Sequence, residues 1–199
     1  MPRGRRRFQR PIGQRRYRRI FILAVEGAKT EPEYFAIFNS EQSLIRVNCL
    51  KGQGESSPLQ VLKRMEGHLR EECLKKSDEA WLVVDKDQWS DAQLTQLHQW
   101  SLREENYGLA LTNPKFEFWL LLHFEDGSGV SGSHSCSDRL KKYLPDYDKG
   151  IDSRLFTSEM IAGAIQRAKL RDNPPCVDWP RGFGSTVYRL VEKILKNSA

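Results

Sequence analysis

The sequence lacks long apolar stretches and is poor in cysteine, and both shortages exclude classes of protein. No apolar run approaches the ~20 residues that a membrane-spanning helix requires. The basic N-terminus has no apolar core of the kind that secretory signals carry, so we expect a cytoplasmic protein without a membrane partner. Only four cysteines occur, without CxxC spacing, which argues against a disulfide framework and against a structural zinc site.

Two further absences concern the number of domains and the mode of phosphate binding. No internal repeat is visible, and the length of 199 residues fits one domain with at most a small appendage. The Gly-rich loop at 51–57 lacks the GxxxxGK[ST] pattern of a Walker A motif. This loop, with Lys51, is therefore either a contact to a substrate phosphate or a plain connection.

Acidic residues are missing from the first 19 positions, which hold nine arginines. Subtracting these nine charges from the formal net charge of +6 leaves −3 for the remainder, so a mildly acidic body carries a strongly basic arm. We expect residues 1–18 to be disordered and to contact the phosphate backbone of a nucleic acid, the alternative being a solvated tail. The arginines assigned to this contact are Arg5, Arg6, Arg7, Arg15, Arg16, Arg18 and Arg19.

Two apolar runs end directly in acidic residues. The run at 20–25 is followed by Glu26, and a second run ends in Asp85, with Asp87 two positions on. Unbroken apolar runs are typical of strands buried on both faces of a parallel sheet. The carboxyl ends of parallel strands share one edge, where open α/β sheets bind ligands, so we expect the three carboxylates together. Oxygen donors of this kind suit a hard divalent cation such as Mg²⁺.

Strand and helix patterns alternate along the first part of the chain, which predicts a mainly parallel α/β sheet. The strands are expected at 20–25, 44–50, 80–85 and 108–112. The helices are expected at about 31–39, 58–76, 91–106, 113–124, 137–144, 158–170 and 185–195. Thr30, Ser57 and Ser90 are the expected caps of the first three helices. The prediction is a sheet of about four strands flanked by helices, with a helical C-terminal part at about 136–199.

The segment 113–124 places a charged residue within an apolar helix pattern. Glu117 is costly to bury unless it is paired or bound to a metal. It is therefore either a fourth acid of the site or the partner of Lys115 or of another group. His123 is most simply a hydrogen-bonded core residue, with a catalytic role as the alternative.

The Asp85–Asp87 pattern alone is shared by several enzyme classes. Haloacid-dehalogenase-like phosphatases carry it on the first strand, with a small hydroxyl residue where this chain has Trp89. Glycosyltransferases that use it are usually longer and have a sugar-nucleotide site that is not evident here. Several nucleases use the pattern as well, and a polar strand end without function is the remaining alternative.

A glutamate after the first strand, followed by a later strand-terminal DxD, resembles the Toprim domain of topoisomerases, primases and OLD-type nucleases. More closely, VEGAKTEPEYF, VVDKD and NPKFEFWLLLHF together resemble the RloB family of prokaryotic defence-associated proteins. The resemblance extends from residue 20 to the final helix and leaves the arginine arm outside. It implies a single Toprim-like, Rossmann-like RloB domain at 19–199.

This resemblance implies a Toprim-type nuclease that acts as the effector of an anti-phage or abortive-infection system, with a partner ATPase encoded nearby. Mg²⁺ or Mn²⁺ is expected on Glu26, Asp85 and Asp87, and Glu26 is also a candidate general base. Lys29 is the first candidate for stabilising charge on the phosphate, and Glu117 for a further metal or water ligand. Lys86 and Lys115 are expected to contact nucleic acid.

Two alternatives remain open at this point. The chain could be a non-catalytic module that binds nucleic acid or a protein partner in a defence complex, or, less favoured, a small-molecule phosphohydrolase. The substrate of a nuclease could be RNA, including tRNA, or DNA. The oligomeric state is open too, with a homo-oligomer as one alternative.

Overall fold

The computed structural model describes residues 19–39, 43–50, 52, 57–87, 89–145, 147 and 151–198. The predicted arm at 1–18 therefore lies outside the described residues, as does Lys51. The elements, in chain order, are β1 (Arg19–Val25), α1 (Thr30–Ala36), β2 (Ile45–Leu50), α2 (Pro58–Glu71), β3 (Glu79–Asp85), α3 (Asp91–Ser101), β4 (Tyr107–Asn113), α4 (Phe116–Leu121), α5 (Ser133–Tyr143), the short 3₁₀ helix η1 (Ser153–Leu155), α6 (Ser158–Arg171), β5 (Gly184–Ser185) and α7 (Val187–Ser198).

The sheet has the strand order β2-β1-β3-β4-β5. The first four strands are parallel, and β5 runs antiparallel to β4, pairing Ser185 with Thr112. The predicted mainly parallel, Rossmann-like sheet flanked by helices is thus confirmed. The expectation of about four strands missed β5, which the sequence pattern assigned to an irregular loop and the start of a helix. β5 is only two residues long and is fixed by distant partners, such as the Thr186 N–H that donates to the Leu111 carbonyl at 2.8 Å.

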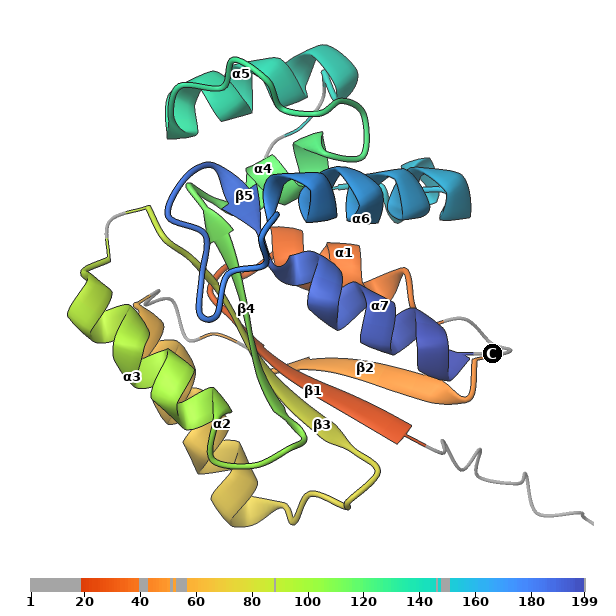
Figure 1. Ribbon diagram of the computed structural model, residues 1–199. Coiled ribbons are helices and arrows are strands. Elements are labelled where there is room, and N and C mark those ends of the chain that lie inside the picture. The colour runs from red at the N-terminus through yellow and green to blue at the C-terminus, as the bar shows by residue number, and fades with distance from the viewer. Residues whose placement is uncertain are drawn as a thin grey trace, which may run out of the picture.

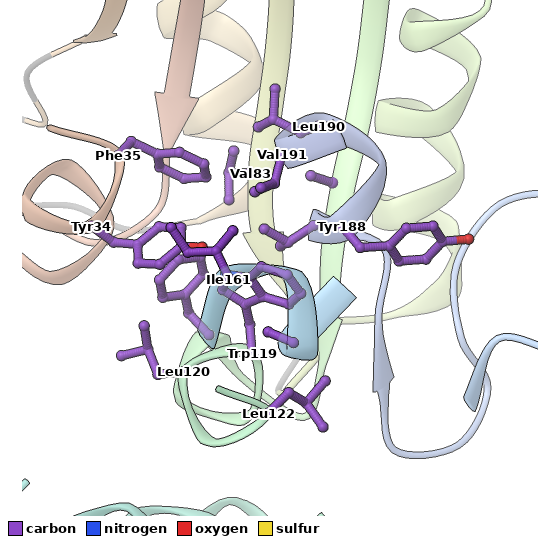
Figure 2. Packing of buried hydrophobic residues seen from close by; sticks show 14 of the residues in the cluster. Tyr34, Phe35, Val83, Trp119, Leu120, Leu122, Ile161, Tyr188, Leu190 and Val191 are labelled. Carbon is purple, nitrogen blue, oxygen red and sulfur yellow. The ribbon is translucent and has the colours of Figure 1, made fainter. Parts of the chain in front are cut away.

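Two apolar layers enclose the sheet. One lies on the α2 and α3 side, and the larger one lies beneath α1 and α7 and continues into α4, α5 and α6 (Figure 1). Figure 2 shows part of this larger layer, where side chains from α1, α4, α6 and α7 meet over β3. The labelled residues are Tyr34, Phe35, Val83, Trp119, Leu120, Leu122, Ile161, Tyr188, Leu190 and Val191. Helices α4, α5 and α6 lie toward the carboxyl ends of the strands, next to that edge of the sheet (Figure 1).

Serine caps set two of the helix starts as predicted. Ser57 and Ser90 each form a capping box, with Gln60 and Gln93 at the third helical position. Both helices end earlier than expected, α2 at Glu71 and α3 at Ser101. For α2 the reason lies in the turn that follows, where Asp78 accepts the backbone N–H groups of Lys75 and Ile20 and brings the chain into β3.

The cap predicted for α1 is wrong. The helix begins at Thr30 itself, with Lys29 in the cap position and no side-chain cap. The hydroxyl of Thr30 instead lies 3.4 Å from the hydroxyl of Tyr147, a residue 117 positions away. A tertiary contact therefore takes the group that the local pattern assigned to capping.

In the part of the chain that the structure describes, no helix combines the length and the apolar character needed to cross a membrane.

Candidate functional site

Glu26 and Asp85 lie side by side at the carboxyl edge of the sheet. β1 and β3 are parallel neighbours in which Val25 pairs with Val83, and the Glu26 N–H donates to the Val83 carbonyl at 3.0 Å. The Glu26 Oε2 atom accepts the backbone N–H of Asp85 at 3.1 Å. The sequence predicted this adjacency from the two matched strand ends, and the structure agrees with it.

Glu26 is oriented by two donors. Its Oε1 atom accepts the indole N–H of Trp89 at 3.1 Å, while Oε2 accepts the Asp85 N–H. Burial raises the pKa of Glu26 above its ordinary value, these two donors oppose the rise, and the charge of Asp87 adds to it. The carboxylate is consequently fixed in place while its proton affinity is increased.

Three of the other acids of the group act electrostatically on Asp85. Burial raises its pKa well above the ordinary value, and the negative charges of Glu31, Glu26 and Glu117 raise it further. The backbone N–H of Phe116, at the start of α4, partly opposes this rise. The edge of the sheet thus concentrates several carboxylates in a poorly solvated place.

Glu31 is a member of this group that the sequence analysis missed. Its side chain is only 5% exposed, and Oε1 accepts the Gly27 N–H at 2.8 Å. Burial, with added repulsion from Glu117 and Glu26, raises the pKa of Glu31 to about 7. A Cβ atom on Gly27 would lie 2.0 Å from Glu31 Oε2, so the carboxylate folds over a position where only glycine leaves room. The sequence signal was its position five residues after Glu26, at the start of the helix that follows, although an acid in a first helical turn is normally explained by the helix dipole alone.

Glu117 has the partner that one of its two predicted alternatives assigned to it, and its role as a fourth acid of a metal site stays a prediction. Its Oε1 atom lies 3.9 Å from the Lys115 ammonium, and it accepts the hydroxyl of Tyr147 at 3.2 Å. Its charge also acts on Asp85 and Glu31. Glu117 is therefore a paired residue that also contributes to the acid group, and Tyr147 is a second participant that sequence reasoning missed.

Asp87 stands at the outer side of the group. It is exposed, its N–H donates to the Pro114 carbonyl at 2.9 Å, and its Oδ1 accepts the Ser133 hydroxyl at 2.9 Å. The first contact fixes the turn after β3 against the start of α4, and the second links it to α5. Asp87 thus lies near Glu26, whose pKa it raises, but is held by its own partner.

The predicted cationic residues are distributed unevenly around the acids. Lys86 donates to Asp91 at 2.9 Å, and Lys115 donates to Ser137 at 2.6 Å. Lys29 is exposed, and no described carboxylate forms an ion pair with it. Lys86 and Lys115 thus each have a partner within the protein, whereas the ammonium of Lys29 is free of ion pairs with the described carboxylates.

Arg19 does not lie at the acid edge. It begins β1 and its guanidinium lies 3.4 Å from Glu79, the first residue of β3. Both residues are at the amino ends of their strands, on the opposite edge of the sheet. The prediction that Arg19 contacts nucleic acid together with the other arm arginines stays a prediction, and such a contact would lie at the other end of β1 from Glu26.

His123 is a core residue. It is 3% exposed, its Nε2 lies 3.2 Å from the Tyr34 hydroxyl, and its Nδ1 lies 3.1 Å from the Trp119 carbonyl. Burial lowers the pKa of His123 to about 4, so the ring is neutral at physiological pH. These contacts support the interpretation of His123 as a hydrogen-bonded core residue and not as a catalytic one.

The acids are of the residue type that binds a divalent cation, but their carboxylates do not converge on one point. All the possible metal ligands are carboxylate oxygens, and burial together with neighbouring negative charges raises the pKa values of Glu26, Glu31 and Asp85. Among the residues that the structure describes, however, no group of three or more His, Cys, Asp or Glu side chains is arranged to hold one ion. Glu26, Asp87 and Glu117 each accept hydrogen bonds from other partners instead.

The fold and the site define a Rossmann-like α/β protein with a group of partly buried acids at the carboxyl edge of its parallel strands. Residues 21–194 match the model of a protein family described as RloB-like protein. The chain therefore belongs to the RloB-like family. No curated protein and no solved structure matches it.

Proposed function

We propose that this protein is a metal-dependent nuclease that hydrolyses phosphodiester bonds in RNA or DNA. The observation that carries the proposal is the acid group, in which Glu26, Glu31, Asp85 and Glu117 act on one another at the edge where α/β sheets bind ligands. So much desolvated negative charge destabilises the fold unless protons or a cation compensate it. Perturbed carboxylates of this kind are more frequent at functional sites than elsewhere.

Glu26, Asp85 and Asp87 would hold Mg²⁺ or Mn²⁺, with Glu117 as a further ligand of metal or water. When bound, such an ion polarises the scissile phosphate and favours ionisation of the attacking water. The placement of Glu26 and Asp85 on neighbouring strands supports this assignment, because their relative position is fixed by the ladder between β1 and β3.

The side chain of Glu26 would accept the proton of the attacking water. Its raised pKa makes it a stronger base than an ordinary carboxylate, and the Asp85 and Trp89 N–H groups orient it. Lys29, whose ammonium is exposed near the start of α1, would stabilise charge that develops on the phosphate. Lys86 and Lys115 would contact the nucleic-acid backbone after release from their present partners.

The biological role in this proposal is that of an effector in anti-phage defence or abortive infection. Its support is membership of the RloB-like family together with the resemblance of the glutamate and the DxD pattern to Toprim nucleases. The basic residues before Arg19 would add affinity for nucleic acid, and a partner ATPase would control activity. The choice between RNA, including tRNA, and DNA rests on experiment.

The test is a cleavage assay of purified protein with tRNA, plasmid and single-stranded DNA, each with Mg²⁺, Mn²⁺ or EDTA. Cleavage with metal and none with EDTA is expected, and Glu26→Gln and Asp85→Asn should each lower the rate at least about 100-fold. Asp138→Asn is the matched control, because it removes one carboxylate from the exposed face of α5. If the free protein is silent, the same comparison is made as toxicity in cells that contain the partner.

A binding module is the second candidate, and one observation favours it. No three described acids converge on one point, and two of the site lysines are already paired. In that case wild type and Glu26→Gln would bind nucleic acid alike, cleave none of the three substrates, and be equally harmless or equally toxic in cells. That outcome rejects the nuclease proposal.

A further inference from the structure

Arg64 brings a cation to the acid edge from a helix that the sequence analysis did not connect with the site. It lies in the middle of α2, and its Nη1 atom donates to the Val25 carbonyl at 2.9 Å and to the Leu50 carbonyl at 3.4 Å. Val25 and Leu50 are the last residues of β1 and β2. The guanidinium therefore lies where these two strands end, next to the residue that precedes Glu26.

The neighbours of Arg64 on α2 explain how this position is fixed. Val61 and Met65 are both fully buried in the apolar layer between α2 and the sheet. Arg64 lies between them along the helix, and its side chain is half-buried as it reaches past that layer to the strand ends. The two carbonyl contacts hold Nη1, so the orientation of the whole planar group is restricted.

The charge of Arg64 has no counterion among the described residues. Its Nε and Nη2 atoms have no hydrogen-bond partner there, and no carboxylate forms an ion pair with it. Burial lowers the pKa of Arg64, which is the effect of withdrawing its charge from water. Lys86 and Lys115 differ in this respect, because each already contacts an acidic side chain.

Gly52 lies beside this guanidinium and presents no side chain to it. A Cβ atom at position 52 would lie 3.5 Å from Nη1, 3.6 Å from Nη2 and 3.7 Å from Cζ of Arg64. Gly52 is itself exposed, and it has no side chain to cover the group. The Nε and Nη2 atoms lie on one edge of the guanidinium and match two oxygens of a phosphate.

We infer that Arg64 binds a backbone phosphate of the nucleic acid through its Nε and Nη2 edge, at the ends of β1 and β2. This inference rests on the proposed function, since it assigns the position of the substrate relative to Glu26. The phosphate bound by Arg64 lies on the β2 side of the acid group, while the DxD segment lies on the β3 and β4 side. Arg64 would thus fix the register of the strand at the site, and the substrate would supply the counterion that Arg64 lacks among the described residues.

The test measures binding without hydrolysis. A 5′-fluorescein-labelled single-stranded DNA of 12 nucleotides is titrated with the full chain in EDTA, over a series of NaCl concentrations, and anisotropy gives Kd. Arg64→Met removes the Nε and Nη2 donors together with one positive charge. Lys63→Met removes one positive charge from the exposed neighbouring position of the same helix. Because both variants have the same net charge and the same arm, their difference isolates the local contact.

Arg64→Met should bind roughly tenfold more weakly than Lys63→Met. The slope of log Kd against log salt should also fall by about 0.7, the value for one phosphate contact on a single strand. Equal Kd values and equal slopes for the two variants, with equal melting temperatures, would overturn the inference. So would a wild-type chain that does not bind the oligonucleotide.

A second pair of variants covers the case in which loss of the carbonyl contacts unfolds Arg64→Met. Gly52→Asp keeps Arg64 and places a carboxylate beside it, while Gly52→Asn adds a similar side chain without charge. Weaker binding of Gly52→Asp than of both Gly52→Asn and Lys63→Met supports the inference, and affinity equal to that of either control opposes it. None of these experiments measures cleavage. If the protein binds through Arg64 but hydrolyses no nucleic acid, the nuclease proposal is rejected and the inference about Arg64 stands.

Discussion

The carboxylate of Glu26 accepts a hydrogen bond from the backbone N–H of Asp85 at 3.1 Å, which ties the first acid of the site to the strand that presents the second. The two residues are 59 positions apart in sequence, and their contact depends on the register between β1 and β3. Glu26 is therefore positioned by the sheet and not by its own turn alone. Changes to either strand end should affect both acids together.

Metal binding should stabilise the fold through Asp85. An ion that binds only the folded state adds about 2.7 kcal/mol at 100 times its Kd, which corresponds to a rise of several degrees in Tm. We expect Mg²⁺ or Mn²⁺ at millimolar concentration to raise Tm in wild type and in Asp138→Asn, and to have little effect in Asp85→Asn. The measurement is differential scanning fluorimetry, and equal shifts in all three proteins would contradict the assignment of Asp85.

The metal-free protein should lose stability as pH rises. Burial raises the pKa of Glu31 from 4.5 to about 7, so between these values the folded state binds more protons than the unfolded state. The Glu31 carboxyl group therefore contributes about 3 kcal/mol to the free energy of unfolding below pH 4.5. This contribution is lost as the pH rises through 7. Glu26 and Asp85, whose pKa values are also raised, act in the same direction.

Glu31→Gln should remove the Glu31 part of this pH dependence. The amide oxygen of glutamine can still accept the Gly27 N–H, and the variant should be more stable than wild type at pH 7.5 in EDTA. Urea unfolding between pH 4.5 and 7.5 gives the free energies, with the exposed Glu105→Gln as control. If the profiles of wild type and Glu31→Gln are parallel, the carboxylate does not carry a raised pKa.

Gly27 and Glu31 should be energetically coupled. Gly27→Ala places a methyl group 2.0 Å from Glu31 Oε2, which forces the buried carboxylate out and should cost about 1–3 kcal/mol. In a Glu31→Ala background the same substitution should cost much less, because the clashing atoms are gone. A double-mutant cycle by urea unfolding measures the coupling, and Gly182→Ala, with nothing within 4 Å of its added Cβ, is the control. Additive costs would show that Glu31 does not occupy this position in solution.

The arm should supply salt-dependent affinity for polyanions. Deleting residues 1–18 removes eight of the nine arginines before position 20. Each lost phosphate contact should reduce the salt slope of single-strand binding by about 0.7, with the melting temperature unchanged. Anisotropy across a NaCl series is the measurement, and an unchanged slope would assign the arm another purpose, such as docking a partner.

The sequence alone determined the central part of the site, because strand ends are a local property of the chain. An unbroken apolar run must be buried on both faces, and the polar residue that ends it must reach the edge of the sheet. For Glu26 and Asp85 this reasoning required only a few neighbouring residues each. The parallel arrangement followed from the alternation of strands and helices, and it placed both acids at one edge.

Only the tertiary structure decided which other groups belong to the site. Glu31 has the sequence pattern of an ordinary acid in a first helical turn, and packing against the turn at Gly27 decided its burial. Arg64 has the pattern of a solvated helix residue, and its contact with two strand ends came from the docking of α2. Arg19 was expected to contact nucleic acid, and the direction of β1 decided that it lies beside Glu79, at the opposite edge of the sheet from Glu26.

The physical reason is the range of the interactions. Apolar periodicity, caps and strand ends depend on residues close in sequence, so they can be predicted locally. The burial of a charge depends on what packs over it, as Tyr147 does when its hydroxyl contacts both Glu117 and Thr30, the latter 117 positions away in the chain. Since burial raises the pKa values of Glu26, Glu31 and Asp85, the proton affinities of these three acids are a property of the tertiary structure and not of the sequence motif.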